Sequence, residues 1–248
     1  MTAPSTAPLR IGLFGSGRLA GAIAAAAGKR IAWQVTRQAP PPQRVDVAIE
    51  ASSGSTVSAR VDWALANGTP LVIGSTGWEL GDLARRVGDR IGVLVAPNFS
   101  IGVALLRRLA LVLARFSALD ERRDPYVVEH HHARKADAPS GTAQLLARTL
   151  LEGCPRKRSF AVGGPIAPDQ LSVAVVRAGT TYSEHTVGVD APAEVLELRH
   201  LARGPQAFGD GALLAAEWIA QRRGVHTMDE VAAAVLDPLF ANLGGGSS

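Results

Sequence analysis

The first hundred residues alternate between short apolar runs and helical stretches, and this alternation constrains the fold more than any other feature. Each apolar run is followed by small or polar residues, and most are then followed by a stretch with helical spacing. The apolar runs are residues 9–14, 31–36, 45–50, 70–73 and 91–95, and the helices are expected at 20–27, 56–67 and 79–87. Because repeated strand–helix alternation is typical of a parallel sheet covered on both faces, the pattern predicts a doubly wound α/β domain of the Rossmann type.

The pattern changes after Asn98, where consecutive strands replace the strict alternation. The expected helices are 101–116, 141–151, 205–222 and 227–235, and the expected strands are 126–131, 171–177, 186–189 and 194–200. Because the last three strands follow one another through short links, the sequence favours a mixed or antiparallel sheet in a second, α+β domain.

Composition argues against several classes of protein. The only cysteine is Cys154, so no internal disulfide can form; we expect a packed thiol and a reducing compartment. The sequence has no run of about 18 uncharged apolar residues and no apolar leader before Leu9, so neither a membrane span nor a secretory signal is predicted. The net charge is +4, but the arginines are scattered, which disfavours nucleic-acid binding. We therefore expect a cytoplasmic protein that attracts anionic small molecules.

A glycine-rich turn joins the first expected strand to the first expected helix. It has the pattern G-x-G-x-x-A and consists of Gly15, Ser16, Gly17, Arg18, Leu19 and Ala20. Glycines let the backbone approach a pyrophosphate closely, and a helix N-terminus offers N–H groups and the positive end of its dipole. A plain tight turn is the alternative, but the position between a strand and a helix favours a dinucleotide site.

Two further loops are expected at the same edge of the sheet, because each follows a parallel strand. They contain Gly74, Ser75 and Thr76 after the fourth strand, and Ala96, Pro97, Asn98 and Phe99 after the fifth. Small residues with N–H and hydroxyl groups can line a nicotinamide ribose, although ordinary turns use the same residue types.

The end of the second expected strand favours NADPH over NADH. Domains that bind NAD carry an acidic residue there for the ribose hydroxyls. This chain has Thr36 and Arg37 instead, and its next carboxylate is Asp46. Because an arginine suits a 2′-phosphate, we expect NADPH to be preferred and NADH to be the alternative cofactor.

The most unusual segment is EHHHARKADAPSGT, residues 129–142, which contains three of the six histidines. Histidine and lysine supply protons and positive charge, and N–H groups at the start of the following helix can hold a carboxylate. A metal site would be expected to show a spacing such as H-E-x-x-H, which is missing, so no metal is predicted. A solvated charged loop is the other alternative, but a substrate site is favoured beside a nucleotide-binding half.

This segment resembles the signature E-x-H-H-x-x-K-x-D-x-P-S-G-T-A of the 4-hydroxy-tetrahydrodipicolinate reductases, also called dihydrodipicolinate reductases. The resemblance covers nearly the whole chain. It includes the glycine turn, Gly74–Gly77, Ala96–Val103, Arg177-Ala178-Gly179, Glu184-His185-Thr186, and the closing helix with Phe208 and Gly211.

The resemblance also implies residue roles. It makes His131 and Lys135 the catalytic residues. It also implies that the substrate is bound by His132, Ser140, Gly141 and Thr142. His130 is an extra histidine beside the pair, for which we expect a structural or surface role.

The reaction implied by the resemblance is the reduction of the cyclic dicarboxylate 4-hydroxy-tetrahydrodipicolinate in lysine and diaminopimelate biosynthesis. Water leaves, the nicotinamide delivers hydride to C4, and Lys135 and His131 provide the proton for the adjacent position. The resemblance further implies a homotetramer assembled through the sheet of the second domain. Residues 1–99 and 209–248 would form the dinucleotide-binding domain, and residues 100–208 the substrate-binding and oligomerisation domain.

Three departures from the family pattern concern positions outside the catalytic pair. Residues 37–44 form a short link, the acidic residue after the second strand is absent, and Pro168-Asp169 stands where a proline–glycine turn is usual. Two alternatives therefore remain open, a reductase of another cyclic imine carboxylate and a non-catalytic dinucleotide-binding module. The presence of both His131 and Lys135 argues against the module.

Overall fold

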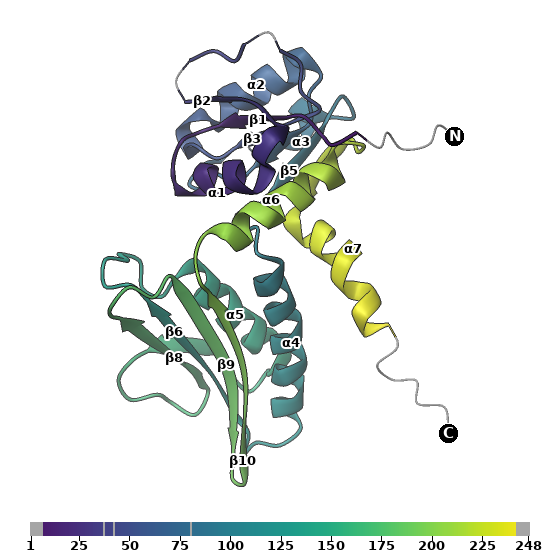
Figure 1. The fold of residues 1–248 in the computed structure, drawn as a ribbon. Helices are drawn as coiled ribbons and strands as arrows, with labels where there is room; N and C mark the ends of the chain where they lie inside the picture. Colours follow the sequence, from purple (N-terminus) through teal and green to yellow (C-terminus); the bar gives the residue numbers. More distant parts are fainter. Residues whose placement is uncertain (1–6, 37, 42, 80, 242–248) are drawn as a thin grey trace. The chain divides into compact units, whose positions relative to one another are not determined.

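The computed structural model describes residues 7–36, 38–41, 43–79 and 81–241. The chain divides into two compact units, one of residues 1–101 and 205–248 and the other of residues 102–204 (Figure 1). The prediction from sequence had placed the boundaries at residues 99 and 209.

The first unit is built on a six-stranded parallel sheet. Its strands are β1 (Ile11–Phe14), β2 (Ile31–Val35), β3 (Val47–Glu50), β4 (Leu71–Ile73), β5 (Gly92–Val95) and β11 (Gly224–Thr227). The order across the sheet is β11-β5-β4-β3-β1-β2, with every neighbouring pair parallel. This arrangement confirms the doubly wound α/β prediction and brings the carboxyl ends of β1 to β5 to one edge.

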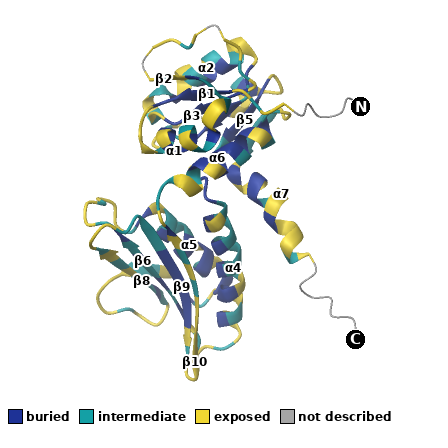
Figure 2. Ribbon diagram, in the orientation of Figure 1, coloured by how far each residue is buried: buried dark blue, intermediate teal, exposed yellow. Residues whose placement is uncertain are grey.

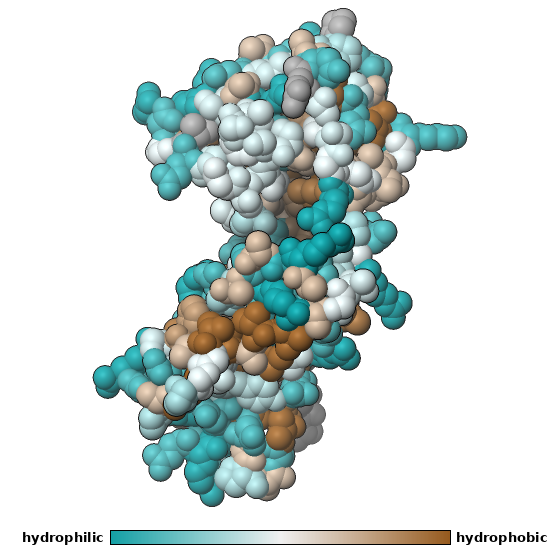
Figure 3. All heavy atoms as spheres, turned by 90° about the vertical axis from the view of Figure 1, so that its left-hand side faces the viewer, coloured by the Kyte–Doolittle hydropathy of each residue, from teal (hydrophilic) through white to brown (hydrophobic). Residues whose placement is uncertain are grey.

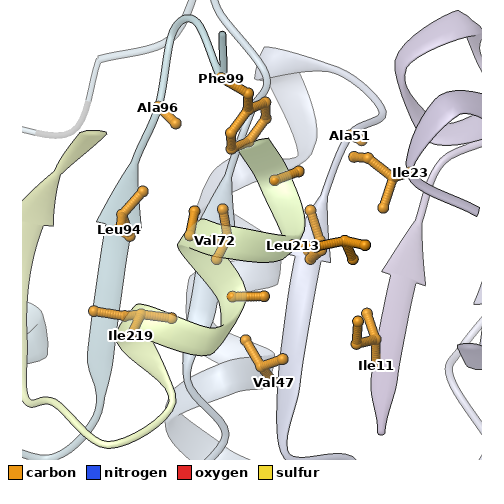
Figure 4. Close-up of a cluster of buried hydrophobic side chains, with 14 of the residues drawn as sticks. Ile11, Ile23, Val47, Ala51, Val72, Leu94, Ala96, Phe99, Leu213 and Ile219 are labelled. Carbon is orange, nitrogen blue, oxygen red and sulfur yellow. The ribbon is translucent and has the colours of Figure 1, made fainter. Parts of the chain in front are cut away.

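Helices cover both faces of this sheet. The helices of this unit are α1 (Arg18–Ala27), α2 (Val57–Asn67), α3 (Leu83–Val87), α6 (Gln206–Ile219) and α7 (Met228–Phe240), with short 3₁₀ turns η1 (Gly28–Arg30) and η2 (Gly54–Thr56). Helices α1 and α6 pack over one face, and their side chains Ile23, Leu213 and Ile219 meet apolar residues of the strands (Figure 4). Helices α2 and α3 pack on the other face. Burying each large aliphatic side chain stabilises the unit by roughly 1.5–3 kcal/mol.

The prediction from sequence was wrong at the segment after α6, where it expected no strand. Residues 224–227 form β11 and pair in parallel with β5 along the edge of the sheet. The strand has four residues, begins with a glycine and is only partly buried, so no apolar run marks it in the sequence. Its pairing with β5 is a long-range contact that local patterns do not encode.

The second unit is a five-stranded mixed sheet with two helices on one face. Its elements are α4 (Ile101–Ala118), β6 (Asp124–His131), α5 (Gly141–Gly153), β7 (Ser159–Val162), β8 (Gln170–Arg177), β9 (Ser183–Ala191) and β10 (Glu194–Ala202). The order is β10-β9-β6-β8-β7, in which β9 is antiparallel to β6 and β10, and β8 is parallel to β6 and β7. The predicted mixed sheet is confirmed, but the short edge strand β7 was not predicted.

Alternation along the strands decides which side chains face the helices. In β6, Val127, Glu129 and His131 are buried, while the residues between them are only partly buried (Figure 2). The core that α4 and α5 form with this face includes Cys154, which is fully buried as expected for a packed thiol. Two polar residues of β6, Glu129 and His131, therefore lie on the helix-covered face of the sheet.

The opposite face of this sheet has no covering helix among the described residues. Apolar side chains exposed on it include Val176, Val195 and Leu201, and Figure 3 shows apolar residues gathered over this unit. Within the described part of the chain, no helix combines the length and the apolar character that crossing a bilayer requires.

Candidate active site

The glycine turn after β1 is held between two neighbouring strands. Gly15 has φ +118°, and a Cβ there would lie 2.4 Å from the carbonyl oxygen of Ala51. The N–H of Gly15 donates to the oxygen of Val35 at 2.8 Å, and Nε2 of Gln34 donates to the oxygen of Gly15 at 2.8 Å. Because only glycine tolerates both this φ and this close approach, the sequence pattern fixes the path of the chain into α1.

A pocket of about 370 Å³ lies where this turn meets the loops after β3 and β4. It is lined by Gly17, Arg18, Leu19, Ala51, Ser52, Ser53, Gly54, Gly74, Ser75 and Thr76. Helix α1 begins at Arg18, has no side-chain cap at Gly17 and carries no acidic residue in its first turn. Its N-terminus thus presents N–H groups and the positive dipole end to the pocket, which suits a pyrophosphate.

Six residues expected to bind the cofactor line this pocket, and four lining residues were missed. The missed residues are Ala51, Ser52, Ser53 and Gly54, which follow β3. The signal in the sequence was the run of small polar residues directly after an apolar strand, at the same edge as the other loops.

Of the remaining expected cofactor residues, those that the structure describes do not line the pocket. Ala20, Ala96 and Phe99 are buried in the core, Gly15 shapes the turn, and Arg37 lies outside the described residues. The ring of Phe99 lies directly behind Gly74, where a Cβ would come within 2.6 Å of it. Ser16, Pro97 and Asn98 also fall outside the lining set.

The end of β2 carries no carboxylate. Thr36 follows the strand, and its carbonyl oxygen accepts a hydrogen bond from Nη2 of Arg60 at 3.1 Å. The next carboxylate, Asp46, accepts a hydrogen bond from the backbone N–H of Arg10 at 2.7 Å. The acidic ligand for ribose hydroxyls that NAD-binding domains place at this strand end is therefore absent.

In the second unit, strand register gathers a buried polar cluster around Glu129. His131 stands opposite Arg177 on β8, and Glu129 stands opposite His185 on β9. The Glu129 side chain is fully buried, and its Oε1 accepts hydrogen bonds from Nη2 of Arg177 at 2.7 Å and from the N–H of Ser140 at 2.9 Å. Its Oε2 lies 3.4 Å from Nδ1 of His131 and 3.6 Å from Nε2 of His185.

The charge states in this cluster follow from burial and from these contacts. Burial opposes ionisation of Glu129, but contacts with His185, Ser140 and Arg177 together outweigh it and hold the pKa of this carboxyl well below its usual range. Burial is also the largest influence on His131, and it lowers the pKa of this imidazole to about 4 despite the neighbouring carboxylate. Near neutral pH the cluster therefore holds an ionised Glu129 beside an uncharged His131.

The two ring nitrogens of His131 have different surroundings. Nδ1 lies 3.4 Å from Oε2 of Glu129 and makes no hydrogen bond with it, but the ionised carboxylate there favours the neutral tautomer that carries its proton on Nδ1. Nε2 is then the nitrogen with a free lone pair, which accepts a hydrogen bond and does not donate one. An uncharged His131 in this tautomer cannot deliver a proton from Nε2.

Lys135 lies in the loop after β6 and forms an ion pair with Asp137, with Nζ 2.7 Å from Oδ1. The same loop is tied to the buried cluster, because Nη2 of Arg177 donates to the carbonyl oxygen of Asp137 at 2.6 Å. The Lys135 side chain is 26% exposed, whereas that of His131 is 6% exposed. The Lys135 ammonium is thus more accessible than the ring of His131.

The three adjacent histidines occupy different surroundings. His131 faces the helix-covered side of the sheet, while His130 faces the open side, where its Nε2 lies 3.0 Å from the carbonyl oxygen of Ala178. His132 follows the end of β6, and its Nδ1 has no hydrogen-bond partner within the described residues. The structure thus separates His130 from the cluster that contains His131.

Helix α5 starts directly beside this cluster. Its N-cap is Ser140, whose Oγ accepts a hydrogen bond from the N–H of Ala143 at 3.1 Å and lies 3.1 Å from Nε2 of His185. Ser140 is 3% exposed, so its polar atoms contact other groups of the protein and not solvent. Gly141 and Thr142 form the first turn, where the helix dipole favours a bound anion.

The ligand-type atoms of Glu129, His131 and His185 lie within 4.8 Å of one another, a grouping able to hold a metal ion. The Glu129 carboxylate, however, already has the guanidinium of Arg177 at 2.7 Å. This arginine supplies the positive charge that a metal ion would otherwise provide, so the donor set is a poor match for a cation.

Comparison with known proteins identifies one family in both halves of the chain. Residues 17–99 match the family model described as dihydrodipicolinate reductase, N-terminus, and residues 102–232 match the one described as dihydrodipicolinate reductase, C-terminus. A 4-hydroxy-tetrahydrodipicolinate reductase of Myxococcus xanthus is 38% identical over 197 residues, covering 76% of this chain and 72% of the relative. That of Laribacter hongkongensis is 38% identical over 170 residues, covering 65% of this chain and 63% of the relative, so the matched part spans less than two thirds of that protein.

Solved structures show the same fold. The dipicolinate-bound dihydrodipicolinate reductase from Paenisporosarcina sp. TG-14 superposes with a TM-score of 0.72 at 19% identity, covering 89% of this chain and 98% of that one. GenD2 from gentamicin A biosynthesis, in complex with NAD, gives a TM-score of 0.53 at 15% identity, covering 97% of this chain and 95% of that one.

A glycine turn at the carboxyl edge of a parallel sheet, together with a separate α+β unit that holds a buried histidine–carboxylate pair, defines a two-domain, dinucleotide-dependent oxidoreductase. Within this class, the two family matches cover most of the chain. The chain belongs to the dihydrodipicolinate reductase family.

Proposed function

We propose that this chain reduces 4-hydroxy-tetrahydrodipicolinate to tetrahydrodipicolinate in lysine and diaminopimelate biosynthesis. The observation that carries the proposal is the cluster at the end of β6. It places an uncharged, oriented His131, a lysine ammonium and the start of α5 within one continuous segment, residues 129–142. The relatives named 4-hydroxy-tetrahydrodipicolinate reductase support this choice of substrate.

The pocket of the first unit fits a nicotinamide dinucleotide. The start of α1, from Gly17 to Leu19, would hold the pyrophosphate, and the small residues after β3 and β4 leave room for the backbone of the ligand. When bound, the reduced cofactor supplies the hydride that goes to C4 of the substrate. Because the end of β2 lacks a carboxylate and is followed by Thr36 and Arg37, we propose that NADPH is preferred over NADH.

The residues of the second unit donate the proton, orient the substrate and bind its carboxylates. Lys135 donates the proton to the carbon next to C4, because its ammonium is accessible and His131 is uncharged near neutral pH. His131 accepts a hydrogen bond at Nε2 and thereby orients the substrate or the lysine. His132 and the first-turn N–H groups at Gly141 and Thr142 bind the ring carboxylates, whereas Ser140 acts by capping the helix.

The open face of the second sheet supports a homotetramer assembled through this sheet. Val176, Val195 and Leu201 expose 40%, 54% and 45% of their surface there, and exposed apolar patches of this kind mark contact surfaces. Light scattering on the purified protein should give the mass of four chains, and Leu201→Glu should lower it. A monomer mass for the unaltered protein would contradict the assembly.

The reaction itself is tested by a coupled assay. Freshly made product of dihydrodipicolinate synthase is added to the purified chain with NADPH or NADH, and cofactor oxidation is followed by absorbance. The proposal predicts rapid oxidation that depends on the dicarboxylate, with a higher kcat/KM for NADPH. Cofactor binding without oxidation would refute the proposed substrate, and a higher kcat/KM for NADH would refute the proposed preference.

A further inference from the structure

One fully buried carboxylate lies beneath the cofactor pocket. Glu50 is the last residue of β3, and its side chain is 0% exposed. Its Oε1 accepts hydrogen bonds from the N–H and Oγ of Ser52 at 2.7 and 2.5 Å, from the N–H of Ser53 at 3.3 Å and from Oγ of Ser75 at 3.1 Å. A single oxygen atom thus receives four hydrogen bonds.

The donors come from two loops that are separate in sequence. Ser52 and Ser53 follow β3, Ser75 follows β4, and all three line the pocket. Since both loops bind the same oxygen atom, their positions relative to each other depend on Glu50. The carboxylate therefore connects two walls of the pocket without being exposed in it.

The second carboxylate oxygen faces Arg60, whose side chain is 14% exposed. Nε of Arg60 lies 3.5 Å from Oε2 of Glu50, and the Arg60 guanidinium stacks 4.1 Å from the ring centroid of Phe14. Arg60 also donates to the carbonyl oxygen of Thr36 at the end of β2. The positive charge offsets that of Glu50, so the pocket above does not repel an anionic ligand, and the pair links the ends of β2, β3 and β4.

We propose that Glu50 is a positioning residue for the dinucleotide, which holds the loops after β3 and β4 in the shape that accepts the cofactor. The inference rests on the proposed function only in taking the pocket as the cofactor site. Glu50 cannot touch the cofactor, because its side chain is fully buried. A buried ion pair contributes little to stability compared with apolar residues of the same size, so loop geometry is the better reason for a carboxylate here.

Positioning predicts an effect on cofactor affinity more than on turnover. A pocket whose walls are already in place avoids the cost of ordering them upon binding. Without the carboxylate, the two loops must be ordered by the ligand itself. The dissociation constant should then rise, while the rate at saturating cofactor should change little, because the groups that touch the substrate are elsewhere in the chain.

The test is NADPH binding to Glu50→Gln, followed by nicotinamide fluorescence in the absence of any dicarboxylate. We expect the Kd for NADPH to rise about tenfold, equivalent to about 1.4 kcal/mol, with kcat at saturating NADPH within about twofold of the unaltered protein. Glu50→Asp, which keeps the charge on a shorter side chain, should recover part of the affinity. The matched control is Asp62→Asn, which breaks the 2.6 Å ion pair with Arg86 in the same unit, outside the pocket, and should leave the Kd unchanged.

Two outcomes would overturn the proposal. One is a folded Glu50→Gln protein that binds NADPH as tightly as the unaltered chain. If Glu50→Gln does not fold, the test uses Arg60→Gln instead, because Arg60 does not line the pocket. Unchanged NADPH affinity in Arg60→Gln is then the second outcome that would overturn the proposal. Failure of the proposed reaction would look different, since the unaltered chain would bind NADPH without reducing the dicarboxylate.

Discussion

At the scale of single residues, the cluster at the end of β6 divides the proton chemistry between two side chains. The family resemblance implied that His131 and Lys135 share the donation. Burial lowers the pKa of His131 to about 4, so the ring is uncharged near neutral pH, and our proposal therefore assigns the donation to Lys135 alone. No local pattern reveals this division, because it depends on the burial of His131, which arises only in the folded chain.

Lys135→Ala should therefore remove turnover and spare cofactor binding. The expected loss in kcat is about 10²–10⁴-fold, the usual contribution of a positioned acid, while the Kd for NADPH should stay within about twofold. Steady-state kinetics and fluorescence titration measure the two effects. Lys29→Ala, which removes an exposed lysine of the first unit, serves as the control and should change neither value. If Lys135→Ala also lost NADPH binding, the assignment of Lys135 as the proton donor would be wrong.

The low pKa of His131 also predicts how stability depends on pH. Below the ordinary histidine pKa of 6.5 the unfolded chain takes up a proton at this residue, while the folded chain does not until about pH 4. The free energy of unfolding should therefore fall as the pH decreases from about 6.5 towards 4. His200, whose pKa is also lowered, mainly by burial, contributes in the same direction.

Urea unfolding between pH 7.5 and 5 measures this dependence, with His131→Gln as the comparison. Since that variant has no titrating group at the position, its stability should change less over the same interval. Equal slopes for the two proteins would mean that His131 is charged in the folded state.

At the scale of elements, the sequence predicted most helices and strands because their apolar residues repeat with the correct period. Runs such as Val47–Glu50 and the spacing in α2 are explicit local signals. The missed strands, β7 and β11, are four-residue edge strands with no fully buried residue. Edge pairing depends on what the rest of the fold offers as a partner, so it cannot be derived from so short a segment.

The start of α5 carries a prediction at this scale. Ser140→Ala removes the N-cap acceptor of Ala143 and should lower the free energy of unfolding by about 1 kcal/mol. It should also raise the KM for the dicarboxylate, because the first turn would lose the contacts that the Ser140 hydroxyl makes with Ala143 and His185. Thr227→Ala at the capped start of α7 is the control, with a similar loss of stability and an unchanged KM. An unchanged KM in Ser140→Ala would mean that the start of α5 does not bind the substrate.

At the scale of the whole molecule, each unit contains one fully buried glutamate at its site. Glu50 is paired with Arg60 and Glu129 with Arg177, and both carboxylates collect hydrogen bonds from the loops or the helix start that follow the strands. Sequence patterns identified the glycine turn and the histidine–lysine segment. They did not identify either arginine partner, because Arg177 comes together with Glu129 only through strand register, and Arg60 reaches Glu50 only through the packing of α2 on the sheet.

The most direct test of the central claim follows the hydride with a label and tests the proton donor by comparing the unaltered protein with Lys135→Ala. The chain is incubated with freshly made substrate and with NADPH in which both hydrogens at nicotinamide C4 are replaced by deuterium, and the product is analysed by mass spectrometry. The account predicts one deuterium at ring C4 of tetrahydrodipicolinate, formed by the unaltered protein and at least a hundredfold more slowly by Lys135→Ala. A product without deuterium, or equal rates for the two proteins, would contradict it.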